Sequence, residues 1–235
     1  MGLSAQAELL ADQLPENDPK SRYIHVITRE VERINDTITR MLNFVRPYSP
    51  ARDEVDLLDI CRDVIDLVEA RAREKDLELE APWELGELSP SGWLANLDGG
   101  QIKQVLLNLL INAVDAAGQG GLVQLSLAHV DNLEIQDKQR GTRVALPGFR
   151  LEIRDSGPGV PEADREKIFR PFFTTKNTGT GLGLSNAQRI LKAHGGRIEV
   201  GNRHPSGTAF KIMLPTEPVN PDLADTDSRA LFISS

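Results

Sequence analysis

The chain has 235 residues, of which 40% are hydrophobic, 26% charged and 5% aromatic, and its net charge is −8. This length predicts one large domain or one domain with an appendage, and the sequence contains neither the apolar run of a membrane span nor the basic start of a signal peptide. The acidic balance disfavours nucleic acid as a partner, the single Cys61 excludes a disulfide framework or a cysteine-rich zinc site, and a cytoplasmic location is the default expectation.

The first 47 residues are predicted to form a helical hairpin with one short arm. A short apolar pattern over 3–14 and a turn over 15–19 precede a longer apolar seam with alternating steps of three and four. The seam consists of Ile24, Ile27, Val31, Ile34, Ile38, Met41 and Val45. Because the short arm leaves part of this seam uncovered, either dimerisation as a four-helix bundle covers it or the first helix begins earlier in a longer parent protein. A single helix lying on its own domain is the alternative.

Pro47 and Pro50 mark a linker to a mixed α/β region. Alternating apolar residues predict strands over 54–57, 77–81, 93–97, 122–130, 149–155, 197–201 and 208–214, and helical periodicity predicts helices ending near 75 and covering 101–117, 162–168 and 182–194. Cys61 falls at an apolar step of the first of these helices and is expected to be a buried side chain. The polar stretch 131–148 is interpreted as a hairpin extension, and the acidic tail from Thr216 as loose.

Three polar side chains, Asn108, Asn112 and Asp115, share one face of the otherwise apolar helix over 101–117. A buried amide without a partner costs about 1–3 kcal/mol, so these groups need partners. Either backbone or water satisfies them, or they form a pocket wall that presents oxygens to Mg²⁺ and phosphates.

A strand end follows with the sequence Asp155-Ser-Gly157-Pro-Gly159-Val160. The glycines allow a tight turn and a close approach of a ligand to the backbone. The carboxylate at the strand end can accept a hydrogen bond from an adenine amino group, although a plain β-turn explains the same sequence.

The third motif runs from Phe169 to Lys176 and continues through Gly179, Gly181 and Gly183. The glycine-rich part buries little and is expected to move as a lid. Its last glycines open a helix, and the free N–H groups of a helix start bind phosphate. No Gly-Lys-Ser/Thr ends the segment, so it is not a P-loop.

These motifs follow one another in a specific order between Asn108 and Gly183. In this order the chain resembles the histidine kinases of two-component systems, and the resemblance covers 53–215. It implies an α/β sandwich ATP-binding domain of the Bergerat type, shared with type II topoisomerases and mismatch-repair ATPases. The implied domains are a truncated dimerisation hairpin over 1–47, the catalytic ATP-binding domain over 48–215 and the tail over 216–235.

The motifs resemble the N, G1, F and G2 boxes of that family. The resemblance implies that Asn112 holds Mg²⁺, with Asn108 near the phosphates. It also implies that Asp155 binds the adenine amino group, that Lys176 contacts phosphates and that Thr208 lines the adenine end. Asn108, Asn112 and Lys176 are the catalytic candidates. The implied nucleotide-binding residues are Asn108, Asn112, Asp115, Asp155, Gly157, Gly159, Val160, Phe172, Thr175, Lys176, Gly179, Thr180, Gly181, Leu182, Gly183, Leu184 and Thr208.

The resemblance also indicates the reaction and the partners. In the related ATPases a glutamate four residues before the metal-binding asparagine activates water, and this chain has Asn108 there. An amide is a poor general base, which favours phosphoryl transfer to a side chain over hydrolysis. The implied partner in phosphoryl transfer is the receiver domain of a response regulator. A second copy of the chain is also implied, because the hairpin resembles the dimerisation hairpin of nitrogen-regulatory sensor kinases.

The phosphoacceptor histidine box of that family is missing. Val26 follows His25 where an acidic residue is needed, and His129, His194 and His204 fall in a strand, at a helix end and in a Pro/Gly loop. We therefore expect a fragment that begins just after the box, binds ATP and cannot phosphorylate itself there, with membrane attachment only through an upstream segment. A natural gene without the box is the alternative. A non-catalytic module whose lid controls partner docking, and an ATPase of the topoisomerase type, remain open.

Overall fold

The computed structural model shows two compact units, Met1–Pro47 and Tyr48–Ser235, which are described separately. The described residues are 23–24, 26–28, 31, 49–82, 92–137, 142–176, 180–202 and 206–217. In the first unit the described residues are helical, and the Thr28 hydroxyl donates a hydrogen bond of 3.1 Å to the Ile24 carbonyl. The rest of the predicted hairpin, His25 included, lies outside the described residues. Within the described ranges, no helix is long and apolar enough to cross a membrane.

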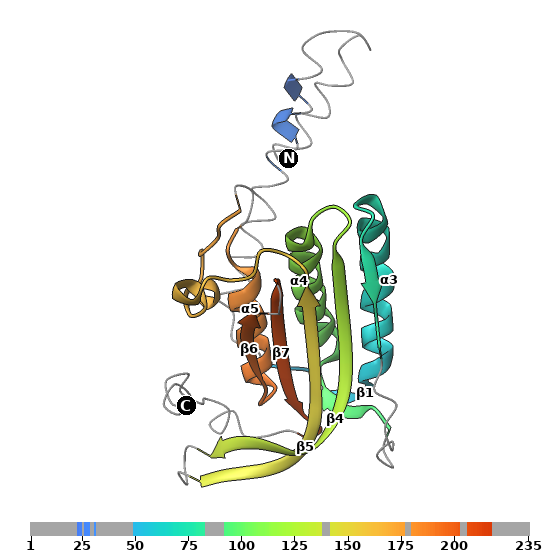
Figure 1. The fold of residues 1–235 in the computed structure, drawn as a ribbon. Helices are drawn as coiled ribbons and strands as arrows, with labels where there is room; N and C mark the ends of the chain where they lie inside the picture. The colour runs from blue at the N-terminus through green and yellow to red at the C-terminus, as the bar shows by residue number, and fades with distance from the viewer. Residues whose placement is uncertain are drawn as a thin grey trace. The chain divides into compact units, whose positions relative to one another are not determined.

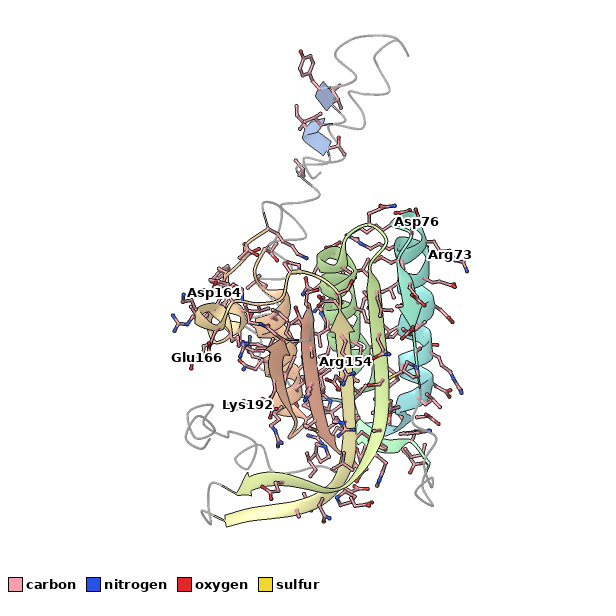
Figure 2. All side chains as sticks on the ribbon, in the orientation of Figure 1. Arg73, Asp76, Arg154, Asp164, Glu166 and Lys192 are labelled. Carbon is pink, nitrogen blue, oxygen red and sulfur yellow. The ribbon has the colours of Figure 1, made fainter. Side chains whose placement is uncertain are left out.

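The second unit is built on a five-stranded mixed sheet (Figure 1). In spatial order its strands are β2 (Glu78–Glu80), β4 (Leu122–Asp137), β5 (Thr142–Asp155), β7 (Thr208–Pro215) and β6 (Arg197–Asn202). β2 and β4 are parallel, and the other neighbouring strands are antiparallel. The five strands predicted in these stretches are confirmed, with small differences at their ends.

Three helices cover one face of the sheet, as Figure 1 shows. They are α3 (Leu57–Glu74), α4 (Gly99–Ala117) and α5 (Gly183–Ala193). Leu125 and Leu127 of β4, and Leu151 and Ile153 of β5, are fully buried, because alternate residues of a strand point to the same face. α4 contacts both other helices and both central strands. The expected helix-on-sheet α/β sandwich is therefore confirmed.

A small antiparallel sheet pairs β1 (Asp53–Asp56) with β3 (Leu94–Leu97), and each strand leads into a helix that an aspartate caps. Asp56 accepts hydrogen bonds from two backbone N–H groups in the first turn of α3, and Asp98 accepts one from Gln101 at the start of α4. These carboxylates satisfy amides that a helix start leaves without partners. The cap at Asp98 explains why α4 begins at Gly99, earlier than its apolar pattern indicates.

The predicted hairpin extension is confirmed, since β4 and β5 stay paired from Val130 and Gly148 out to Asp137 and Thr142. The register shifts between Val130 and Leu133, and Leu133 is buried against Val130, Leu146 and Met213. A bulge bends a strand, which lets this ribbon pack against the end of β7.

The helix predicted over 162–168 is wrong. The structure has two short 3₁₀ turns there, η1 (Glu162–Asp164) and η2 (Lys167–Phe169), and neither has a buried residue. The segment lacks the apolar stripe that stabilises an amphipathic helix by packing. A smaller correction concerns Thr216, predicted as the start of a loose tail. Its N–H donates to the Pro147 carbonyl at 3.1 Å, and its carbonyl accepts from Asn96 at 2.9 Å, so Thr216 belongs to the folded domain.

Candidate functional site

The turn after β5 is organised around the buried carboxylate of Asp155, which is 1% exposed. Its Oδ1 accepts hydrogen bonds from the backbone N–H of Gly157 at 2.8 Å and of Thr208, the first residue of β7, at 3.2 Å. One carboxylate oxygen therefore ties the end of β5 to the turn that follows it and to the neighbouring strand. Such a short network fixes the turn before any ligand binds.

Two glycines in this region leave no room for a side chain. A Cβ on Gly157 would lie 2.6 Å from the Ala116 carbonyl oxygen of α4. A Cβ on Gly207 would lie 1.8 Å from the Asp155 carbonyl oxygen, and Gly207 has φ = +117°. Backbone therefore packs directly on backbone where α4, β5 and β7 meet, which only glycine permits.

Two further side chains hold the turn, Ser156 and Asn202, and neither is among the site residues predicted from the sequence. The Ser156 hydroxyl accepts a hydrogen bond of 2.8 Å from the Leu122 N–H, and Asn202 Oδ1 accepts one of 3.3 Å from the Val160 N–H. The signal for Ser156 was its place between Asp155 and Gly157. For Asn202, at the end of β6, the local sequence held no signal, because its role depends on the strand order.

A second cluster lies on the last turns of α4 around Asp115. Its Oδ1 accepts hydrogen bonds from Arg71 at 2.7 Å and Lys75 at 3.1 Å, and its Oδ2 accepts one from Lys176 Nζ at 3.1 Å. Lys176 Nζ also donates to Asn112 Oδ1 at 3.2 Å. The fold therefore brings a lysine from the turn before the glycine-rich segment onto the face of α4 that carries Asn112 and Asp115.

The cluster keeps Asp115 ionised. Partial burial alone would raise the pKa of Asp115, but the hydrogen bonds from Arg71, Lys176 and Lys75 outweigh burial and lower the pKa to about 2. Three cations surround one carboxylate, so the four side chains carry a net positive charge of two. This is an electrostatic environment that attracts an anion.

The third motif folds back on itself through Phe172 and Gly181. The Phe172 N–H donates to the Gly181 carbonyl at 3.0 Å, and a Cβ on Gly181 would lie 2.4 Å from the Phe172 carbonyl carbon. Both residues have positive φ, +67° and +68°, which is unusual for phenylalanine. The backbone at Phe172 therefore lies directly against the backbone at Gly181, while the Phe172 side chain is 56% exposed.

The start of α5 lies beside α4. Leu182 occupies the N-cap position, and no side chain among the described residues caps this helix. A Cβ on Gly183 would lie 4.0 Å from Asn112 Nδ2, so the first turn of α5 faces the polar side of α4. An uncapped helix start with its amides directed outward is a site for phosphate or another anion.

Residues 97–218 match a family model described as histidine kinase-, DNA gyrase B- and HSP90-like ATPase. This match covers more than half of the chain, and it includes the Asp155 turn, the cluster members Asn112, Asp115 and Lys176, and the start of α5. The chain belongs to this family. It carries the catalytic ATPase domain of a histidine kinase, since the similar proteins of known function are histidine kinases.

The sensor histidine kinase ZraS of Escherichia coli strain K12 is 30% identical over 89% of this chain and 41% of its own length. The histidine-protein kinase AtoS of the same strain is 34% identical over 86% of this chain and 30% of its own length. The chain therefore spans less than half of these curated relatives. The crystallised catalytic domain of histidine kinase ThkA superposes with a TM-score of 0.59 at 32% identity, covering 71% of this chain and 97% of that domain.

Within this histidine kinase ATPase domain, several predicted site residues come together and others do not. Asn112, Asp115 and Lys176 form one cluster, and Asp155, Gly157, Val160 and Thr208 form another. The last turn of α4 joins them, because Asp115 lies in the first cluster and the next residue, Ala116, packs on Gly157. Gly159 adopts φ = +81° in the second cluster.

The remaining predicted residues contribute differently. Leu182 and Leu184 pack into the core instead of facing outward, and Asn108 is half-buried with no hydrogen bond to another described side chain. Thr175 and Thr180 make no side-chain hydrogen bond to other described residues, and Gly179 lies outside the described ranges. His194 is fully buried, so it is not an accessible phosphoacceptor, and His129 lies in β4 with its ring against Phe149. Arg71 and Lys75, which the end of α3 brings to Asp115, are further residues of the site that no motif in the sequence marks.

Proposed function

We propose that the domain binds Mg²⁺-ATP and transfers the γ-phosphoryl group to a histidine that lies outside this chain, for relay to an aspartate of a response regulator. The observation that carries the proposal is the contact of Lys176 with Asn112 and Asp115, next to the uncapped start of α5. A structure of histidine kinase ThkA in complex with the response regulator protein TrrA supports the proposal. The ThkA chain is 27% identical to this chain, with a TM-score of 0.66, and the match covers 92% of this chain and 57% of ThkA.

The adenine end of ATP fits the turn around Asp155. Its carboxylate already fixes the turn through the N–H groups of Gly157 and Thr208, so it is preorganised to accept a hydrogen bond from the exocyclic amine of adenine. Gly157 and Gly159 present bare backbone, which lets a flat base approach closely. Removing the carboxylate charge by Asp155→Asn should abolish ATP binding.

The phosphate end fits the start of α5 and the Asp115 cluster. The amides from Gly181 to Gly183 and the ammonium of Lys176 are donors suited to phosphate oxygens. Asn112 offers an amide oxygen, a hard ligand of the kind Mg²⁺ uses while it keeps several waters. When bound, ATP would supply the phosphoryl group and Mg²⁺ would neutralise part of the phosphate charge. Lys176, Asn112 and the amides at the start of α5 would hold and orient the phosphates.

The residue one turn before Asn112 on α4 favours phosphoryl transfer over hydrolysis of ATP. Asn108, one turn earlier on α4, is an amide and cannot take a proton from water at neutral pH. Phosphoryl transfer needs positioning and charge stabilisation more than a base. An acceptor histidine with a free nitrogen lone pair is its own nucleophile: its nitrogen bonds to the γ-phosphorus as the bond to the bridging oxygen breaks and ADP leaves.

The first unit is proposed to supply dimer contacts. The seam over 24–45 fits a four-helix bundle formed by two hairpins, as in sensor kinases of the nitrogen-regulatory type. A homodimer and a response-regulator partner follow from the same proposal.

The test is to incubate the chain with radiolabelled ATP, Mg²⁺ and a separate polypeptide that bears a family histidine box. The expected result is acid-labile, alkali-stable label on that polypeptide, lost with Asp155→Asn and retained with Lys103→Gln, which breaks only a surface ion pair to Asp63. ATP binding without label on the polypeptide would contradict phosphotransfer. Steady release of phosphate would instead support an ATPase.

A further inference from the structure

The Asp115 cluster has more cations than its single carboxylate needs. Arg71 and Lys75 share Oδ1 at 2.7 and 3.1 Å, and Lys176 alone occupies Oδ2 at 3.1 Å. If Asp115 served only to hold Lys176, the two cations from α3 would be superfluous. Their presence indicates that the carboxylate must stay neutralised when one partner is gone.

The three cations are held unequally. Arg71 lies in the last turn of α3, and Lys75 is the C-cap residue that follows it. Lys75 Nζ also donates to the Val114 carbonyl of α4 at 3.2 Å, so both cations join the end of α3 to α4. Lys176 lies in a turn outside any helix or strand and is 43% exposed, and the hydrogen bonds of its backbone are local, to the Thr174 hydroxyl. Besides Asp115, its Nζ contacts Asn112, a neutral amide, at 3.2 Å. Lys176 is therefore the partner that is free to leave Asp115.

We propose that Asp115 holds Lys176 while the nucleotide site is empty, and that Arg71 and Lys75 neutralise Asp115 once Lys176 moves to a phosphate. Arg71 and Lys75 are thus positioning residues for the nucleotide site, acting through Asp115 without touching ATP. The inference rests on the proposed binding of phosphates by Lys176. Without the α3 pair, the departure of Lys176 would leave a bare carboxylate beside the incoming phosphates, and like charges at close range repel.

A competing explanation is that the α3 pair only fastens α3 to α4. The chain offers a matched control, because Lys103 of α4 pairs with Asp63 of α3 at 2.8 Å, with neither residue in the cluster. Lys103→Gln removes an ion pair between the same two helices and should leave ATP affinity unchanged. Arg71→Gln with Lys75→Gln removes the neutralising pair and keeps side chains of similar length.

The experiment is a double-mutant cycle on the full chain, with Kd measured calorimetrically for Mg²⁺-ATP and for adenosine, which lacks phosphates. The Arg71→Gln/Lys75→Gln variant should weaken Mg²⁺-ATP binding by about tenfold or more and leave adenosine binding within about twofold. In an Asp115→Asn background the same two substitutions should change the Mg²⁺-ATP Kd by less than about twofold, because no carboxylate remains to neutralise.

Each outcome decides between the explanations. An equal loss of Mg²⁺-ATP affinity with and without Asp115 would overturn the inference in favour of direct contact between the cations and ATP. Parallel loss of adenosine and ATP binding would assign the pair a structural role. No loss in either background would show that the pair does not assist binding. If the unchanged chain fails to bind Mg²⁺-ATP, the proposed function itself is wrong.

Discussion

His194 joins the ends of two helices: its Nε2 accepts a hydrogen bond of 3.0 Å from the backbone N–H of Asp98, and its Nδ1 donates one of 2.8 Å to the Ile190 carbonyl. Asp98 caps the start of α4, and His194 ends α5. Only the neutral ring with its proton on Nδ1 can make both bonds. His194 thus joins α4, which carries Asn112, to α5, which begins at Gly183, and it can do so only while its imidazole ring is neutral.

The first prediction is that protonating His194 destabilises the domain. Burial lowers the pKa of His194, opposed by the bond to Ile190 and assisted by the charge of Arg52. Because the folded-state pKa lies below the unfolded value of about 6.5, the unfolded chain binds more protons between the two. The stabilising contribution is complete above about pH 6.5 and is lost as the pH falls toward the folded-state pKa, by at most about 1.4 kcal/mol per pH unit.

The measurement is urea unfolding between pH 8 and 5 of the unchanged chain and of His194→Gln, which can still accept the Asp98 N–H. The slope of unfolding free energy against pH should be smaller in His194→Gln than in the unchanged chain. Equal slopes in the two proteins would show that His194 is not responsible.

The second prediction concerns Gly207, against which Asp155 packs. Gly207→Ala should lower the unfolding free energy by more than about 3 kcal/mol, since its Cβ would lie 1.8 Å from the Asp155 carbonyl oxygen at φ = +117°. Gly201→Ala is the matched control on the neighbouring strand, where no atom lies within 4 Å of the added Cβ. Its effect should stay within about 0.5 kcal/mol. Chemical denaturation of both variants tests this, and similar losses would contradict it.

The third prediction concerns the relative stability of glycine and alanine variants at position 172, where glycine should be the more stable of the two. Phe172→Gly should be more stable than Phe172→Ala by about 1 kcal/mol, because φ is +67° and only glycine adopts it without strain. Both variants lose the same ring, which is 56% exposed, so the difference isolates the backbone. Comparing the midpoints of thermal unfolding measures it. An Ala variant at least as stable as the Gly variant would show that this turn is unstrained.

Sequence patterns predicted the helices and strands that bury an apolar stripe, because one face of α4 or alternate residues of β4 repeat with a readable period. They failed over 162–168, where no residue is buried and local turns replace a helix. The motif glycines were found, but the obstruction that requires Gly157 comes from Ala116 on another element. Such contacts depend on tertiary packing, which local periodicity does not encode.

The same limit applies to the charged side chains of the candidate site. Asp115 was identified by its helix face, yet its partners Arg71 and Lys75 lie 44 and 40 residues away on α3. In the sequence they are an ordinary basic pair near a helix end, where the helix dipole favours cations. Only the packing of α3 on α4 makes them partners of Asp115.

The last prediction is that Cys61 does not react in the folded protein. Its side chain is fully buried on α3, and burial, assisted by the charge of Asp56, raises the pKa of the thiol to about 12. Since the thiolate is the reactive form, an aromatic disulfide reagent at pH 8 should modify Cys61 only through unfolding. The rate should therefore rise with urea in step with the unfolded fraction, and Cys61→Ser should give no signal. Rapid modification without denaturant would contradict the burial of the Cys61 side chain on α3.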